Sequence, residues 1–137
     1  MSQRQFFGYG SIKFLETILS ETGSRNVFLV TGRNSYETSG ARESIEEILH
    51  KKRFNFKRFC GLSSNPQQQE VEAGLKLFQE GDYDTLIGVG GGSPLDVAKE
   101  IKFRFFKKAN RKIPLIAIPT TAGSGSESTH FTVYYLD

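Results

Sequence analysis

A run of small residues at positions 88–99, Gly-Val-Gly-Gly-Gly-Ser-Pro-Leu-Asp-Val-Ala-Lys, has the composition of an anion-binding loop. It lies between an apolar stretch and an amphipathic one, which predicts a strand, a glycine turn and a helix in that order. Amide groups at a helix start and the helix dipole favour a phosphate, and glycine lets that phosphate approach the backbone. We therefore expect Gly91, Gly92 and Ser93 to bind a pyrophosphate, with Ser93 also capping the helix. The alternative is a tight turn that binds nothing.

Asp96 belongs to the same predicted helix, where we expect it in the first turn. A carboxylate at that position suits the positive end of the helix dipole without any ligand. The functional alternative is that Asp96 accepts a hydrogen bond from a ribose hydroxyl or from a cofactor amide.

A second loop, Pro-Thr-Thr-Ala-Gly-Ser-Gly-Ser-Glu at 119–127, also follows an apolar stretch. The hydroxyl groups of Thr120, Thr121 and Ser126 can hydrogen-bond a nucleotide without adding bulk or charge. The alternative is a Ser/Gly linker, which its place directly after an apolar stretch disfavours.

A third turn, at 32–35, offers Gly32, Arg33 and Ser35 but no acid. Dinucleotide folds often hold the adenosine ribose with an acid at this point, so its absence favours NADP over NAD. Asn65 precedes a proline. Its amide is suited to contact an adenine or a ribose, and the alternative is that it only caps a helix.

These loops need elements to position them, and strand and helix signals alternate along the chain. The predicted strands are 5–9, 26–31, 54–59, 85–89, 113–118 and 129–136. Helices are predicted to begin at Ser11, at Ser39 or Ser44, at Asn65–Pro66, and at Pro94. This order predicts an α/β domain with a Rossmann-like parallel sheet, helices on both faces and a hairpin-like last segment. Ligands of such sheets bind beyond the carboxyl ends of the strands, where all three loops lie.

Composition narrows the class of protein. The 137 residues carry a net charge of +3 and 37% hydrophobic residues, which is enough for one folded domain. The basic stretches 51–58 and 104–108 contain aromatic residues, but Phe alternates with polar or basic residues over 54–59 as in a half-buried strand, so we expect no nucleic acid partner. A single cysteine, Cys60, allows no internal disulfide. No apolar run is long enough to span a membrane or serve as a signal peptide, which predicts a cytoplasmic protein.

Catalytic residues are not evident. His50 and His130 are far apart in sequence and lack metal-ligand partners at useful spacing. No Ser-His-Asp set, paired carboxylates or nucleophile elbow can be found. The chain therefore has binding motifs without a catalytic set, and we assign it no catalytic or metal residue.

Taken together, the motifs resemble a known family. Gly90–Lys99 and Ile118–Glu127, with Phe7–Gly10, Thr31–Gly32 and Asn65–Pro66 at family-like spacing, closely resemble the iron-containing (group III) alcohol dehydrogenases. The wider superfamily includes glycerol dehydrogenase and dehydroquinate synthase. The stretch 31–40 also resembles a branch that contains phosphonoacetaldehyde reductases.

This resemblance implies an N-terminal α/β domain that binds NAD(P) and a helical C-terminal domain that holds Fe(II) or another divalent metal. Hydride transfer between the nicotinamide and a small alcohol or aldehyde takes place in the cleft between these two domains. The turn from Gly32 to Ser35 resembles that of the NADP-using members. The cofactor-binding residues carried over are Gly32, Ser35, Asn65, Gly91, Gly92, Ser93, Asp96, Thr120, Thr121 and Ser126.

The sequence contains neither the helical domain nor its metal ligands. We therefore expect residues 1–137 to be the cofactor domain of a longer two-domain enzyme, able to bind cofactor but inactive alone. Apolar surface left bare by the missing domain would allow a homodimer. Two alternatives are a dehydroquinate-synthase-like lyase domain, which needs basic and metal-binding residues downstream, and a non-catalytic interaction module, which would self-associate without binding nucleotide.

Overall fold

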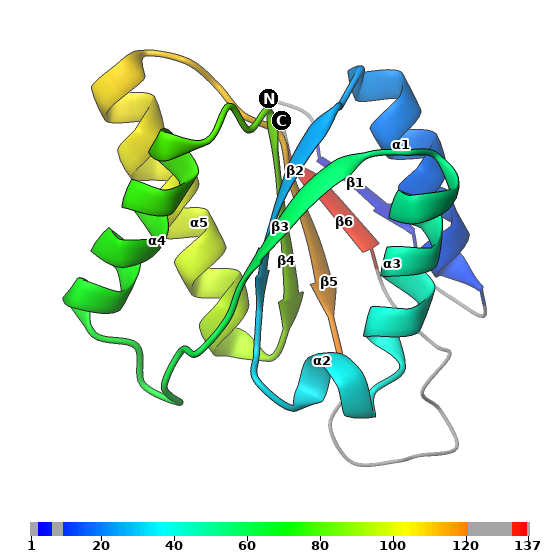
Figure 1. Ribbon diagram of the computed structural model, residues 1–137, viewed down its shortest axis with the longest axis horizontal. Helices are drawn as coiled ribbons and strands as arrows, with labels where there is room; N and C mark the ends of the chain where they lie inside the picture. The colour runs from blue at the N-terminus through cyan, green and yellow to red at the C-terminus, as the bar shows by residue number, and fades with distance from the viewer. Residues whose placement is uncertain (1–2, 7–9, 121–132, 137) are drawn as a thin grey trace.

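The computed structural model describes residues 3–6, 10–120 and 133–136, which form one α/β sandwich (Figure 1). The strands are β1 (Gln3–Phe6), β2 (Asn26–Thr31), β3 (Asn55–Phe59), β4 (Thr85–Gly90), β5 (Leu115–Pro119) and β6 (Val133–Leu136). The helices are a 3-10 turn (Ser11–Lys13), α1 (Phe14–Thr22), α2 (Ser35–Thr38), α3 (Ala41–Lys51), α4 (Gln68–Glu80) and α5 (Gly92–Ala109).

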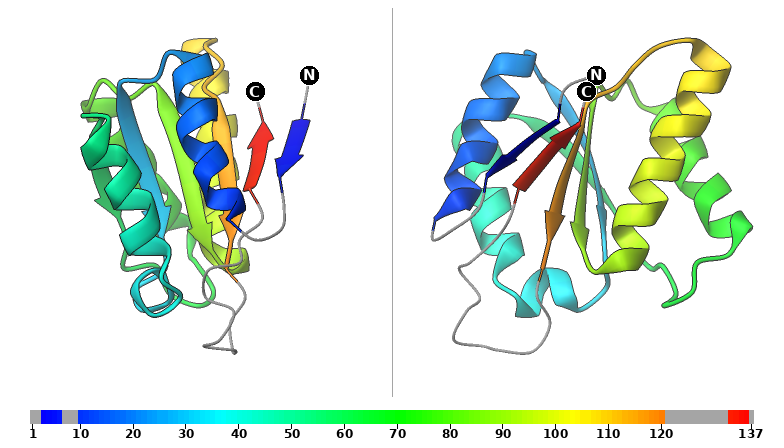
Figure 2. Two further views of the ribbon diagram at one scale, coloured as in Figure 1. Left: turned by 90° about the vertical axis from the view of Figure 1, so that its right-hand side faces the viewer. Right: turned by 180° about the vertical axis from the view of Figure 1, so that it is seen from behind.

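The sheet has the order β1-β6-β5-β4-β2-β3. The four strands from β5 to β3 are parallel, whereas β6 runs antiparallel to both β5 and β1. Figure 2 shows β6 and β1 at the edge of the sheet beside α1. The predicted parallel sheet with a hairpin-like last segment is confirmed.

Alternate side chains of β2 enter two separate cores. Val27 and Leu29 pack with α1 and α3, while Phe28 and Val30 pack with α4 and α5. Because both faces of β2 are buried, its sequence is a continuous apolar run and not an alternation of apolar and polar residues. The helices cover the two faces as Figure 1 shows, with α4 and α5 on the left and α1 and α3 on the right.

Two predicted helix starts are wrong. Ser11 does not cap an α-helix, because it opens a 3-10 turn whose preceding residue is Gly10, and α1 begins only at Phe14. Asn65–Pro66 does not open α4, which begins at Gln68. The carboxylate of Glu70 accepts a 2.6 Å hydrogen bond from the backbone N–H of Gln67, and this capping interaction sets the start of α4.

The helix predicted from Ser39 or Ser44 begins between them, at Ala41, whose N–H donates to the Ser39 hydroxyl at 3.2 Å. The short helix α2 before it was not predicted. The strand predicted at 5–9 begins earlier, at Gln3, and is described as far as Phe6, while the strand predicted at 129–136 is described over Val133–Leu136. Positions 7–9 and 129–132 of those predictions lie outside the described residues.

Candidate functional site

Three loops begin next to one another at the rim of the sheet, which is the carboxyl end of its parallel strands. Adjacent register pairs are Thr31 with Val89 and Gly90 with Pro119, so β2, β4 and β5 end side by side. The backbone N–H of Thr120 donates a 3.0 Å hydrogen bond to the carbonyl oxygen of Gly90. This rim lies at the lower end of the sheet in Figure 1, where α2 and the start of α5 are found.

The glycines of the rim differ in what they require. Gly90 has a φ of 139°, and a Cβ there would lie 2.9 Å from Cγ of Pro94 and 3.7 Å from the backbone nitrogen of Gly32. Only glycine fits that position. A Cβ on Gly91 or Gly92 would meet no atom of residues 3–6, 10–120 or 133–136 within 4 Å, and both glycines are exposed. Gly90 is therefore needed by the fold, whereas the described residues leave the space over Gly91 and Gly92 open.

The start of α5 differs from expectation at two residues. Gly91, not Ser93, is the N-cap, so no side chain of the cap accepts hydrogen bonds from the first N–H groups of this 18-residue helix. Asp96 lies in the second turn rather than the first, on the exposed side of the helix. The first turn contains no acid, and its uncompensated N–H groups and dipole favour an anionic ligand.

Ser93 serves a different purpose from capping. Its hydroxyl donates a 2.8 Å hydrogen bond to the carbonyl oxygen of Ser64, in the loop between β3 and α4. The contact brings that loop, with the neighbouring exposed Asn65, to the start of α5. The structure thus gathers Gly32, Gly91, Gly92, Ser93 and Thr120 at the rim and places Asn65 beside it.

The turn after β2 is compact. A Cβ on Gly32 would lie 2.7 Å from Oγ of Ser35 and 3.8 Å from Cγ of Pro94, so the turn packs against the start of α5. Ser35 is half-buried as the first residue of α2. The remaining two predicted site residues, Thr121 and Ser126, lie outside the described residues.

One charged cluster at the rim was not predicted. The Arg58 guanidinium donates from Nε to the hydroxyl oxygen of Thr31 at 2.7 Å and from Nη2 to the carbonyl oxygens of Gly32 and Arg33 at 3.0 and 3.2 Å. Glu37, on α2, has a carboxylate oxygen 3.8 Å from Nη1 of Arg58. The turn at 32–35 contains no acidic residue of its own, but the carboxylate of Glu37 lies near it.

A signal for Arg58 was present in the alternation of the third strand. Phe54 and Phe56 pack against the core shared by α1 and α3, and Arg58 continues their every-second-residue series. It stacks on the buried ring of Tyr36, with the guanidinium carbon 4.6 Å from the ring centroid. Burial raises the pKa of the Tyr36 hydroxyl, and the nearby Glu46 carboxylate, which accepts its hydrogen bond at 3.0 Å, adds to that increase.

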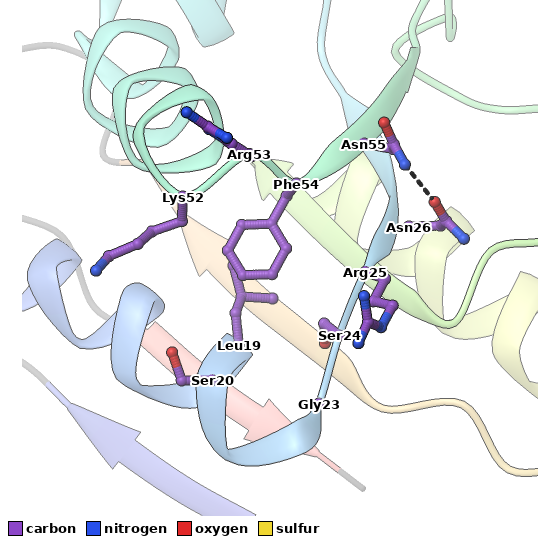
Figure 3. Close-up of a pocket in the computed structure, with 10 residues that line it drawn as sticks. All are labelled: Leu19, Ser20, Gly23, Ser24, Arg25, Asn26, Lys52, Arg53, Phe54 and Asn55. Atoms are coloured by element: carbon purple, nitrogen blue, oxygen red, sulfur yellow. Dashed lines mark hydrogen bonds between the residues drawn. The ribbon is translucent and has the colours of Figure 1, made fainter.

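A polar pocket lies at the opposite end of the sheet, where β2 and β3 begin (Figure 3). Its volume is about 360 Å³, and Arg25, Lys52 and Arg53 line it. The helices α1 and α3 end there, so these cations are explained by the negative ends of two helix dipoles. Lys52 is also paired with Glu16 at 3.0 Å. This pocket is distant from the rim and is not part of the candidate site.

In the described parts of the chain, no three His, Cys, Asp or Glu side chains gather as metal ligands would. Within those same ranges no helix has both the length and the apolar character needed to cross a membrane.

The fold is an open α/β sheet of the kind whose ligands bind beyond the carboxyl ends of the parallel strands. A family model described as "Iron-containing alcohol dehydrogenase" matches residues 2–137. The chain belongs to this iron-containing alcohol dehydrogenase family.

Relatives and solved structures agree with this assignment. The long-chain primary alcohol dehydrogenase AdhA of Thermoanaerobacter ethanolicus is 33% identical over 93% of this chain and 36% of its own length. The NADH-dependent butanol dehydrogenase B of Clostridium acetobutylicum is 31% identical over 95% of this chain and 36% of its own length. An iron-containing alcohol dehydrogenase of Thermotoga maritima has a TM-score of 0.74 at 27% identity, over 89% of this chain and 37% of that one. The chain thus spans little more than a third of the proteins it matches.

Proposed function

We propose that this chain binds the dinucleotide NAD(P) at the rim formed by Gly32, Gly91, Gly92 and Thr120, as the cofactor-binding part of an alcohol dehydrogenase or aldehyde reductase. The observation that carries the proposal is the space that the described residues leave over Gly91 and Gly92, at a helix start without a side-chain cap next to the turn after β2. The names of two relatives, an NADH-dependent butanol dehydrogenase and an NAD-dependent methanol dehydrogenase of Bacillus methanolicus, support a nicotinamide cofactor.

The residues present fit such a ligand in a definite order. The diphosphate would accept hydrogen bonds from backbone N–H groups at the start of α5, each worth about 1.5–3 kcal/mol when the acceptor is charged. Ser35 and Asn65 would lie toward the adenosine end. Asp96 and Thr120 would lie toward the nicotinamide end. NADP is proposed over NAD, because the turn at 32–35 has Arg33 and no acid of its own.

In the proposed reaction the cofactor supplies the hydride chemistry, and a divalent metal such as Fe(II) supplies Lewis acidity toward a small alcohol or aldehyde. The described residues provide no cluster that fits such a metal, so no step through it is derived from this chain. We propose that residues 1–137 bind the cofactor without turning over alcohol. Membership of the iron-containing alcohol dehydrogenase family favours this over a lyase or a purely structural module.

The test is a titration of the chain with NADH and with NADPH, followed through the fluorescence of the reduced nicotinamide. We expect saturable binding of at least one dinucleotide, displaced by ADP, because the diphosphate provides the main contacts. Circular dichroism establishes that the titrated chain is folded. A folded chain that shows no saturable signal up to about millimolar dinucleotide, which corresponds to about −4 kcal/mol, contradicts the proposal.

A further inference from the structure

The guanidinium of Arg58 is rigidly placed at the carboxyl end of the strand pair β2–β3. Its Nε and Nη2 atoms donate to Thr31, Gly32 and Arg33, all at the end of β2 or in the turn that follows. Its flat face lies on the ring of Tyr36 at 4.6 Å, and its side chain is 22% exposed. A cation held in this way does not have to be ordered when an anion binds, which favours affinity.

Part of the guanidinium has no hydrogen-bond partner among the described residues. Nε and Nη2 account for the three hydrogen bonds to the turn, while Nη1 faces only the carboxylate of Glu37, at 3.8 Å. That distance allows attraction between the charges but is too long for a hydrogen bond. Two N–H donors of a half-buried arginine therefore remain available at the rim.

Glu37 is held by a different partner. Its carboxylate oxygen accepts a hydrogen bond from Nη1 of Arg42 at 2.9 Å, and the side chain is 53% exposed. Arg42 in turn approaches Glu46 at 3.4 Å, and Glu46 accepts the hydroxyl of Tyr36. Glu37 thus remains anchored by Arg42 whether or not another anion reaches Arg58. Its negative charge weakens the attraction of Arg58 for that anion.

The position of this pair relative to the glycine loop identifies the group it meets. A diphosphate at the start of α5 follows β4, and β2 is the neighbour of β4 on the side away from β5. In doubly wound folds the adenosine ribose extends from the phosphate loop to the end of that neighbouring strand, where an acid accepts the ribose hydroxyls or an arginine binds a 2′-phosphate. Arg58 holds the turn at that strand end.

We propose that Arg58 and Glu37 together determine which dinucleotide this chain prefers, with Arg58 binding the adenosine 2′-phosphate of NADP(H) through Nη1 and Glu37 limiting that preference. The inference rests on the proposed function. The 2′-phosphate takes the place that the loose Arg58–Glu37 contact leaves open, while a dinucleotide without that phosphate gains nothing from Nη1.

The experiment measures the dissociation constants of NADPH and NADH for four chains: wild type, Arg58→Met, Glu37→Gln and Lys57→Met. Lys57 is the matched control, because it is the residue of β3 directly before Arg58, is exposed, and its substitution removes the same charge from the opposite face. We expect Arg58→Met to weaken NADPH about 10- to 100-fold and NADH less than about 3-fold. Lys57→Met should change either constant less than about 2-fold.

Glu37→Gln should act in the opposite direction and strengthen NADPH about 2- to 5-fold without strengthening NADH, because it removes an exposed, partly screened charge. This variant keeps the test valid if Arg58→Met does not fold, since Glu37 is on the surface. The wild-type preference for NADPH should also shrink between about 50 mM and 0.5 M NaCl.

The outcomes separate two failures. If neither dinucleotide binds the folded wild type, the proposed function is wrong and this inference falls with it. If both bind, but Arg58→Met weakens them equally or Glu37→Gln weakens NADPH, the proposed function stands and the assignment of Arg58 and Glu37 is overturned.

Discussion

The hydroxyl of Ser93 donates a 2.8 Å hydrogen bond to the carbonyl oxygen of Ser64, which ties the loop between β3 and α4 to the first turn of α5. The two residues are 29 positions apart in the chain. The contact makes the start of α5 a junction between the glycine loop and the loop that contains Asn65. It also removes the Ser93 hydroxyl from the capping role that its sequence position suggested.

Ser93→Ala should loosen this junction. Losing one hydrogen bond to a partly exposed carbonyl is expected to lower the free energy of unfolding by about 0.5–1.5 kcal/mol. It should also weaken dinucleotide binding several-fold, because Asn65 is no longer held beside the rim. Urea unfolding and NADPH titration measure the two effects. Ser20→Ala, in the pocket at the opposite end of the sheet, is the control, and an equal loss of affinity in both variants would contradict the prediction.

The glycines of the rim allow binding to be separated from folding. Gly92→Leu should leave the free energy of unfolding within about 0.5 kcal/mol of wild type, because the residue is exposed and its Cβ meets no described atom within 4 Å. The same side chain fills the space proposed for the diphosphate, so dinucleotide affinity should fall at least about 10-fold.

Gly90→Ala is the matched contrast and should destabilise the chain by about 1–3 kcal/mol, since the residue has a φ of 139° and its Cβ would contact Pro94 at 2.9 Å. Thermal unfolding and NADPH titration of both variants make the comparison. A Gly92→Leu chain that is stable and still binds NADPH like wild type would show that the ligand lies elsewhere.

Much of the fold follows from burial patterns that the sequence displays directly. β2 and β4 are covered on both faces, so they must be apolar throughout, and their predicted bounds differ from the structure by at most one residue. Helix starts were less predictable, because several polar residues compete to cap each helix. At α4 the Gln67–Glu70 pair prevails over Asn65–Pro66, which only the three-dimensional contacts reveal.

The position of the glycine loop was predictable where it depends on backbone. Gly91 and Gly92 stand out in the sequence as residues without side chains after an apolar stretch, and the structure places them directly after β4, at the start of α5. Arg58 was not recognised, because its partners Thr31, Gly32 and Arg33 are 25–27 positions away in sequence and come into reach only when β3 pairs with β2. Glu37 was missed because the short helix α2 returns it to the rim.

The Glu70 carboxylate should stabilise the chain at neutral pH, and this contribution should be lost in acid. Hydrogen bonds from the backbone N–H groups of Gln67 and Ser63 and from the Ser63 hydroxyl lower its pKa below the ordinary value of 4.5. A lowered pKa in the folded state contributes stability above about pH 4.5, and this contribution is lost as the pH falls through the folded value. Glu70→Gln should therefore lower the melting temperature at pH 7 more than at pH 3.

The control for this measurement is Glu72→Gln, two positions along the same helix, where the carboxylate accepts only a 3.3 Å hydrogen bond from Gln68. Its effect on the melting temperature should be smaller at pH 7. If the Glu70→Gln difference from wild type is the same at both pH values, the carboxylate charge does not stabilise the start of α4.

Tyr36 should control stability at the alkaline end. Its hydroxyl is buried and donates to Glu46, and both effects raise its pKa above the ordinary value of 10.0. A raised pKa means that this stabilisation is complete below about pH 10 and is lost as the pH rises further, because the unfolded tyrosine ionises first. Tyr36→Phe should cost about 1–2 kcal/mol at pH 7 through the lost hydrogen bond, and it should make stability less dependent on pH above 10.

Urea unfolding at pH 7 and pH 10.5 measures the loss of stability and its dependence on pH. The comparison is Tyr134→Phe, because the half-buried side chain of Tyr134 lies on a different element, β6. Equal alkaline sensitivity in the two variants would show that Tyr36 ionises like an ordinary tyrosine.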